Sequence, residues 1–145
     1  MNKQQLEQRI RSGIPLSEHM DFRVIELTDH SIVVQGGGDQ NINVHGTGFA
    51  GSQYAVCTLA LWGMVTSRLP KQATLVMANG EIKYHKPVVG DIVASCELGR
   101  EAMDAFLGKL ETDGRARLEA EVYVPSSDEP DAVFKGIVYS RIKQN

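Results

Sequence analysis

Apolar residues recur at helical spacing at the start of the chain and at strand spacing soon after. Leu6, Ile10 and Ile14 are separated by polar residues and predict a short amphipathic helix. Two β-branched segments, residues 22–27 and 31–35, flank a short polar turn and predict a β-hairpin. The chain is therefore expected to open with a helix followed by two paired strands.

The longest apolar segment, residues 47–69, has helical spacing. It contains no acidic residue and one basic residue, Arg68. A helix on a protein surface has a charged face, so this helix is expected to be enclosed by protein on most sides. Polar residues interrupt the segment too often for a membrane span.

The rest of the chain predicts mainly strands, which are expected at residues 73–84, 92–98, 118–124 and 132–142. Between the second and third of these strands, four apolar residues at helical spacing favour a second, shorter helix, with a distorted strand as the alternative. These four residues are Met103, Phe106, Leu107 and Leu110. No βαβ alternation is present, so the pattern predicts an α+β fold, an antiparallel sheet wrapped around the long helix. One sheet covers only part of such a helix, which predicts a partner subunit.

Composition and charge narrow the possible functions. A chain of 145 residues with 42% hydrophobic content is expected to form one domain, residues 1–145. A net charge of −3 gives no basic surface for nucleic acid. Cys57 and Cys96 lie far apart in sequence and predict neither a metal site nor a disulfide framework. The N-terminal residues lack the apolar region of a secretory signal, so a cytoplasmic location is expected.

Residues 46–51 match the pattern G-x-G-x-x-G, which is typical of dinucleotide sites. The residues before it do not form a buried strand, and no acidic residue occurs between Asp39 and Glu81 to bind a ribose. No nicotinamide or flavin cofactor is therefore expected. Small residues at the start of a buried helix instead leave backbone N–H groups open to a carbonyl that becomes an oxyanion. The alternative is that these glycines only permit tight turns and close packing.

Residues 43–52 and 84–91 resemble the hotdog-fold thioesterase superfamily, and the similarity extends from about residue 22 to residue 142. The most specific part is similar to the thioesterase domain that occurs alone or at the C-terminus of some bacterial acetyltransferases. Related single-domain proteins are associated with malonyl-thioester decarboxylation. The resemblance implies a sheet around a central helix and a homodimer or dimer of dimers. It also implies acyl-CoA or acyl-carrier-protein substrates at the subunit interface, with CoA or phosphopantetheine present only as part of the substrate.

The resemblance also assigns roles to residues. The His-Gly-Gly that is common at the family's helix start corresponds to residues 49–51, so the oxyanion-binding N–H would belong to Ala50 or Gly51. A polar Asn that often precedes it corresponds to Asn43. The carboxylate that many relatives carry two turns into the helix would fall near Cys57 or Thr58, where this chain has no acid. Asp39 is the remaining acid in the preceding loop.

Three polar residues near the helix start have two interpretations each. Asn43 is a candidate catalytic residue that holds a thioester oxygen or a carboxylate, or else a structural amide. His45 is a candidate acid or base near neutral pH, or else a structural residue that hydrogen-bonds to the backbone. The hydroxyl of Ser52 would bind the acyl group together with Ala50 and Gly51, or would cap backbone N–H groups.

Two reactions are compatible with these candidate residues. Hydrolysis normally needs a base to activate water or a nucleophile to attack directly. Decarboxylation of a malonyl thioester needs a stabilised enolate oxygen and no such base, so the missing acid favours decarboxylation or a weakened thioesterase. The alternative from another class is a noncatalytic protein that binds or senses acyl-CoA or an acyl carrier, because a fold alone does not fix a function.

Overall fold

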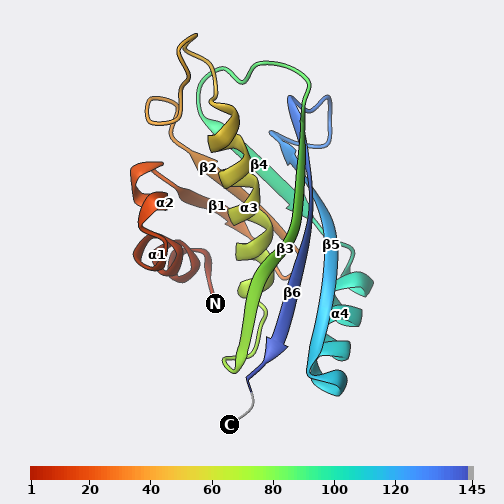
Figure 1. Cartoon of the computed structure of the whole chain (residues 1–145). Helices are drawn as coiled ribbons and strands as arrows, with labels where there is room; N and C mark the ends of the chain where they lie inside the picture. Colours follow the sequence, from red (N-terminus) through yellow and green to blue (C-terminus); the bar gives the residue numbers. More distant parts are fainter. Residues whose placement is uncertain (144–145) are drawn as a thin grey trace.

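Two N-terminal helices begin the chain in the computed structural model, which describes residues 1–143 (Figure 1). The first helix, α1 (Lys3–Gly13), starts at a capping box between Asn2 and Gln5 and is followed by α2 (Pro15–His19). Leu6 and Ile10 are fully buried, as their spacing predicts. They pack against the central helix at Gly63, where an added Cβ would lie 3.3 Å from Ile10.

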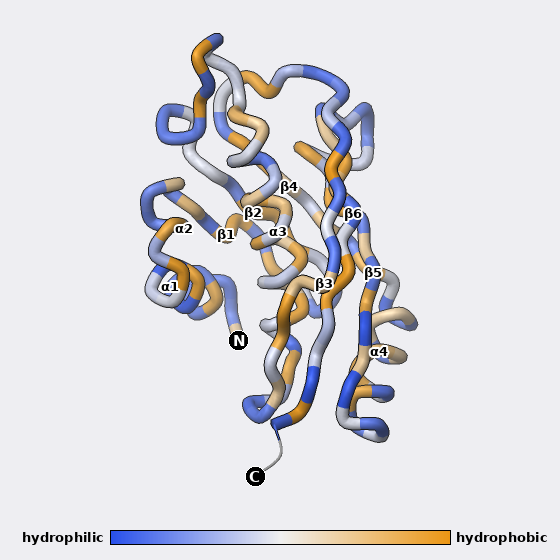
Figure 2. The backbone as a smooth tube through the Cα atoms, viewed as in Figure 1, coloured by the Kyte–Doolittle hydropathy of each residue, from blue (hydrophilic) through white to orange (hydrophobic). Residues whose placement is uncertain are grey.

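The strands form one six-stranded antiparallel sheet in the order β1-β2-β4-β5-β6-β3. Their bounds are β1 (Arg23–Leu27), β2 (Ser31–Gly36), β3 (Ala73–Tyr84), β4 (Ile92–Glu97), β5 (Arg115–Val124) and β6 (Ala132–Ile142). The hairpin and the last strand are confirmed, and β5 begins earlier than expected, at Arg115. Hydrophobic and hydrophilic residues alternate along β5 (Figure 2). Buried positions alternate with less buried ones along β5 and β6, because one face of each strand packs inward.

The helix α3 (Ala50–Thr66) lies across the sheet, and most of its residues are buried (Figure 1). In Figure 2, α3 lacks the strongly hydrophilic segments that α1 and α4 contain. The α+β prediction is therefore confirmed. The expected start at residue 47 is wrong, because Gly48 pairs with Ile42 in an isolated β-bridge and Phe49 has an extended backbone with a ψ of 133°, so the helix begins at Ala50. None of the helices in the described residues is long and apolar enough to cross a membrane.

The second helix, α4 (Arg100–Asp113), packs against β5 (Figure 1). Met103, Phe106 and Leu110 are buried, so the helical interpretation of their spacing is confirmed and the distorted strand is wrong. The helix ends at Gly114, whose φ of 76° lies in the left-handed region that favours glycine.

The two edges of the sheet differ. On β1, the N–H of Val24 donates to the carboxylate of Glu7 at 2.8 Å, and the ammonium of Lys3 donates to the carbonyl of Ile25 at 3.2 Å. Side chains of α1 thus hydrogen-bond to backbone groups at the β1 edge. On β3, no side chain within residues 1–143 hydrogen-bonds to the backbone of residues 76–84. The β3 edge is therefore open to another strand.

Candidate functional site

The loop between β2 and α3 is held to the body of the protein by Asn41. The side chain of Asn41 is buried, and its amide donates to the carbonyls of Met20 at 2.9 Å and Gly37 at 2.7 Å. Its own carbonyl accepts the N–H of Phe49 at 2.8 Å. Asn41 therefore joins the first part of the loop to the residue that precedes α3.

Asn43 organises the tip of the same loop. Its Oδ1 accepts the N–H groups of His45 at 2.8 Å and Thr47 at 3.2 Å, and its Nδ2 donates to the Thr47 hydroxyl at 3.0 Å. The carbonyl of Asn43 also accepts the N–H of Gly46 at 3.0 Å. The side-chain amide is therefore engaged inside the loop, the arrangement expected of a structural amide.

The glycines of residues 46–51 meet local conformational demands. Gly46 has a φ of 77°, in the left-handed region. Gly48 lies so close to Val88 that an added Cβ would sit 3.0 Å from the Val88 Cβ, and its N–H donates to the Val88 carbonyl at 2.8 Å. The motif follows an irregular loop in an antiparallel sheet, not the parallel strand of a dinucleotide fold.

The first turn of α3 presents free hydrogen-bond donors. Phe49, at the N-cap, has no side-chain oxygen, and no cap hydrogen bond forms. Among residues 1–143, no acceptor is found for the backbone N–H groups of Ala50, Gly51 or Ser52. Ala50 and Gly51 are exposed and Ser52 is half-buried. The helix dipole adds partial positive charge at this end, so the turn can bind an anion or a developing oxyanion.

Tyr84 borders this turn and was not singled out from the sequence as a site residue. Its hydroxyl donates to the carbonyl of Ala50 at 2.7 Å. Burial raises the pKa of the Tyr84 phenol above its ordinary value, with smaller contributions from Cys57 and Tyr54. The phenol therefore stays protonated and remains a donor at neutral pH.

The two residues at the position of the missing carboxylate face different ways. Cys57 is fully buried, and burial raises the pKa of its thiol, so it is held as a thiol rather than a nucleophilic thiolate. Thr58 is half-buried, and its hydroxyl has no partner within residues 1–143. Thr58 is the residue on the less enclosed side of α3.

The other predicted residues lie at the surface of the loop. His45 and Asp39 are both exposed, and no hydrogen bond within the described part of the chain links either side chain to the first turn of α3. The structure thus groups Ala50, Gly51 and Ser52 at one end of α3, with Asn43 supporting them. No hydrogen bond within residues 1–143 joins the side chain of His45 or Asp39 to these three residues.

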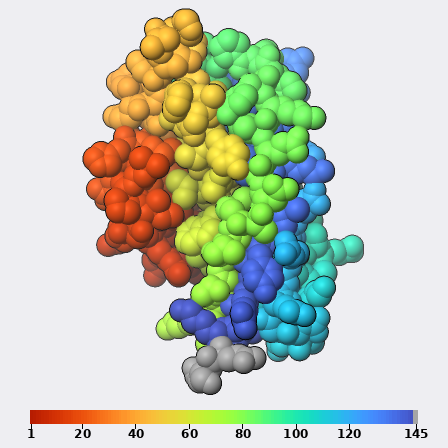
Figure 3. Space-filling model, viewed as in Figure 1, coloured from red at the N-terminus to blue at the C-terminus, as the bar shows by residue number. Residues whose placement is uncertain are grey.

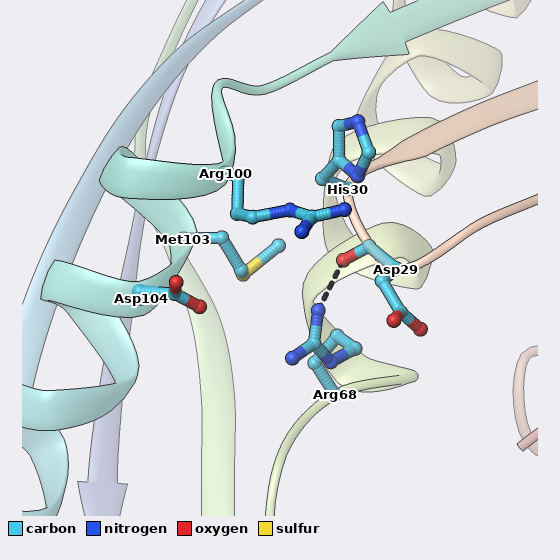
Figure 4. Close-up of a pocket in the computed structure, with 6 residues that line it drawn as sticks. All are labelled: Asp29, His30, Arg68, Arg100, Met103 and Asp104. Carbon is cyan, nitrogen blue, oxygen red and sulfur yellow. Dashed lines mark hydrogen bonds between the residues drawn. The ribbon is translucent and has the colours of Figure 1, made fainter.

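Other features of the chain lie away from this loop. In the part of the chain that the structure describes, no three His, Cys, Asp or Glu side chains are grouped as metal ligands. A pocket of about 270 Å³ lies between the β1–β2 turn and the start of α4 (Figure 4). Arg68 there donates to the carbonyl of Asp29, and Arg100 reaches toward His30. None of its lining residues comes from the loop before α3.

Comparison with solved structures supports the architecture. A putative thioesterase from Shewanella oneidensis is 29% identical, with a TM-score of 0.80, and the alignment covers 96% of each chain. A protein of unknown function from Chlorobaculum tepidum is 24% identical, with a TM-score of 0.88 over 97% of this chain and 94% of that one. A thioesterase from Haemophilus influenzae is 13% identical, with a TM-score of 0.73 over 98% of this chain and 92% of that one. The last two show the fold alone.

The match to a protein family covers nearly the whole chain. The family described as "Putative thioesterase (yiiD_Cterm)" matches residues 3–141, which include the loop, α3 and all six strands. The sheet around a helix agrees with the hotdog fold of its thioesterase-like neighbours. The chain therefore belongs to this putative thioesterase family and has its hotdog fold.

Proposed function

We propose that this protein is an enzyme that binds an acyl thioester of CoA or of an acyl carrier protein, with the thioester carbonyl at the N-terminus of α3. One observation carries the proposal: the N–H groups of Ala50, Gly51 and Ser52 have no acceptor within residues 1–143 at an accessible helix end. Donors held in place before the reaction stabilise an oxyanion without reorganising, at about 2.7–4 kcal/mol each.

The reaction that we favour is decarboxylation of a malonyl thioester. The carbon–carbon bond to the carboxylate breaks, carbon dioxide leaves, and the bonding electrons move into the thioester to form an enolate. The N–H groups of Ala50 and Gly51 would stabilise the enolate oxygen, and a proton from water would then give the acetyl thioester. This reaction requires no carboxylate, and α3 has none between Ala50 and Thr66.

Hydrolysis is the second candidate because the family is that of a putative thioesterase. Water would add to the carbonyl and the thiol would leave, which requires a base near the first turn of α3. His45 and Asp39 are the candidates near this end, and either would have to approach from the surface of the loop. A noncatalytic protein that binds or senses acyl thioesters is the remaining alternative.

The proposed site is completed by a second copy of the chain. In Figure 3, α3 is visible as a strip between the N-terminal residues and β3. Tyr54 and Thr58, about one helical turn apart, are only partly covered. Near the start of α3, Val44 is 96% exposed and Val89 is 84% exposed, a high cost for apolar side chains that stay in water. The open β3 edge beside this strip favours a homodimer, and a dimer of dimers would need a second interface in addition.

Product analysis tests the reaction directly. The purified protein is incubated with malonyl, acetyl and long-chain acyl thioesters of CoA and of an acyl carrier protein, and products are identified by mass spectrometry. Decarboxylation converts the malonyl thioester to the acetyl thioester and leaves the carrier attached. Hydrolysis releases the free thiol from any substrate that reacts. Saturable binding with neither product would support the sensing alternative and contradict the enzyme proposal.

A further inference from the structure

A second pocket, of about 500 Å³, lies at the C-terminal end of α3, opposite to the loop described above. It is bounded by α1, the end of α3, the first residues of β3 and Lys143. Trp62 and Thr66 line the pocket 12 and 16 residues after Ala50, so it lies roughly 18–24 Å along the helix from the start of α3, at a rise of about 1.5 Å per residue. The two places on α3 are therefore separate within one chain.

Only cations provide side-chain charge in this pocket. Arg9, Lys71 and Lys143 line it, and no Asp or Glu from residues 1–143 does. No salt bridge within the described residues joins any of the three to a carboxylate. The pocket of Figure 4 differs, because two acids, Asp29 and Asp104, line it together with its arginines. Three like charges at one hollow repel one another, and an anion bound between them would remove that repulsion.

The C-terminal carbonyl groups of α3 should not repel an anion in this pocket, because those of residues 63–66 already accept hydrogen bonds. Helix C-termini carry partial negative charge on carbonyl groups that lack donors. Here the carbonyls of Gly63 and Val65 accept from the N–H of Ser67, and Val65 also accepts from the N–H of Arg68. The carbonyl of Met64 accepts the Ser67 hydroxyl at 2.7 Å. The Thr66 carbonyl accepts the N–H of Leu69.

An aromatic side chain forms one wall of this pocket. Trp62 lines the pocket, with its ring fixed by a hydrogen bond of 3.0 Å from Nε1 to the Leu75 carbonyl. The pocket thus combines cations with an aromatic wall.

We propose that this pocket binds a small phosphate-bearing molecule that has an aromatic or apolar group, the chemistry of a nucleotide. The phosphate would lie among Arg9, Lys71 and Lys143. The ring of the ligand would lie against Trp62, as aromatic groups pack on one another. The inference does not depend on the thioester reaction, because its site and its measurement are both separate from the N-terminal turn of α3.

Trp62 provides the measurement because it is the one tryptophan in the sequence. Its fluorescence is followed during titration with inorganic pyrophosphate, adenosine, adenosine 5′-monophosphate and adenosine 3′,5′-bisphosphate, with calorimetry on the same preparations. We expect saturable changes with the nucleotides, weaker changes with pyrophosphate and none with adenosine. Tighter binding of the bisphosphate than of the monophosphate would identify the nucleotide part of CoA as the source, and equal binding would identify a free nucleotide. Affinity should fall as salt increases.

Substitutions test the location. Arg9→Gln and Lys71→Gln should each weaken nucleotide binding about tenfold or more, as expected for charge-assisted hydrogen bonds. Lys109→Gln, on the exposed surface of α4, is the matched control and should bind as the unmodified protein does.

Two results would overturn the proposal. One is the absence of saturable binding of any phosphate probe at millimolar concentration. The other is unchanged affinity in the Arg9 and Lys71 variants, or an equal loss in Lys109→Gln. If Arg9→Gln unfolds because α1 is disturbed, Lys143→Gln replaces it, since Lys143 lies outside every helix and strand.

Discussion

The hydroxyl of Tyr84 donates a hydrogen bond of 2.7 Å to the carbonyl of Ala50, although the two residues lie 34 positions apart in sequence. Tyr84 is the last residue of β3, and Ala50 is the first residue of α3. The bond therefore ties the end of an edge strand to the turn that presents the free N–H groups. It fixes the carbonyl side of Ala50 and leaves the N–H of Ala50 unengaged.

Tyr84 should ionise at a higher pH than an ordinary tyrosine. Burial raises the pKa of its phenol, so folding favours the protonated form. This contribution to stability is present below the ordinary value near pH 10 and is lost as pH rises through the higher pKa of the folded protein. In a pH titration, the ultraviolet tyrosinate absorbance should contain a component that appears at high pH and is missing in Tyr84→Phe.

Tyr123 provides the control for this titration. Its pKa is also raised, mainly by the hydrogen bond from its hydroxyl to Glu121, and it lies on β5, away from the loop before α3. Tyr123→Phe should remove a different component at high pH and leave the component of Tyr84 in place. A Tyr84→Phe titration identical to that of the unmodified protein would contradict the assignment.

The sequence predicted the fold well because burial imposes regular spacing. Alternation predicted β5, and the absence of acids from residues 47–69 predicted a covered helix. The start of that helix was misplaced because loop contacts hold residues 47–49, with the N–H groups of Thr47 and Phe49 bonded to Asn43 and Asn41. Gly48 pairs with Val88, 40 positions away, and such a pairing leaves no periodic signal.

The site was less predictable for the same reason. Asn43 bonds to residues within a few positions, so its loop role could be proposed from sequence. The contact of Tyr84 with Ala50 depends on where β3 ends relative to α3. The choice between Cys57 and Thr58 depends on the rotation of α3 against the sheet, which all its packing contacts fix together.

Asn43→Ala should lower stability, because it removes the acceptor for the N–H groups of His45 and Thr47. The expected loss is about 1–2 kcal/mol, the range for a polar side chain that caps backbone donors. Denaturant unfolding of Asn43→Ala and Asn43→Asp checks this, since Asp keeps the accepting oxygen and should retain more of the stability. A direct catalytic role for Asn43 would instead give an unchanged unfolding curve for Asn43→Ala, with turnover reduced about 10²–10³-fold.

The open edge of the sheet should be the site of assembly. Val76 is 55% exposed on β3, and Ile25 is 39% exposed on β1, whose backbone is occupied by α1. Light scattering at micromolar concentration should give at least twice the mass of one chain. Val76→Lys should weaken association at least tenfold, whereas Ile25→Lys should leave it unchanged. A stable monomer, or equal effects of the two lysines, would contradict assembly through β3.

Cys57 should be dispensable for turnover. Its side chain is fully buried, and burial raises the pKa of the thiol, so the thiolate needed for attack is suppressed. Cys57→Ala should keep most of the activity toward whichever thioester reacts, with a modest loss of stability from the smaller side chain. A thiol reagent should modify Cys57 only after unfolding. Loss of turnover in a folded Cys57→Ala protein would assign the thiol a direct role.

Ala50→Pro tests the proposed oxyanion site most directly, because it removes one backbone N–H and keeps the helix. Ala50 is the first helical residue, where proline is well tolerated. The preceding residue, Phe49, has a ψ of 133°, which suits a residue before proline. The Ala50 carbonyl remains available to Tyr84. The melting temperature should therefore change little, while turnover of the reacting thioester should fall about 10²–10³-fold.

The matched variant is Ala50→Ser, which changes the side chain at the same exposed position and keeps the N–H. Its turnover should stay close to that of the unmodified protein. Both variants are compared by turnover, melting temperature and light scattering, so that a loss of folding or assembly is separated from a loss of the donor. If Ala50→Pro is folded and keeps more than about a third of the activity, the Ala50 N–H does not stabilise the transition state. The donor would then have to be the N–H of Gly51 or Ser52, which the substitution leaves in place.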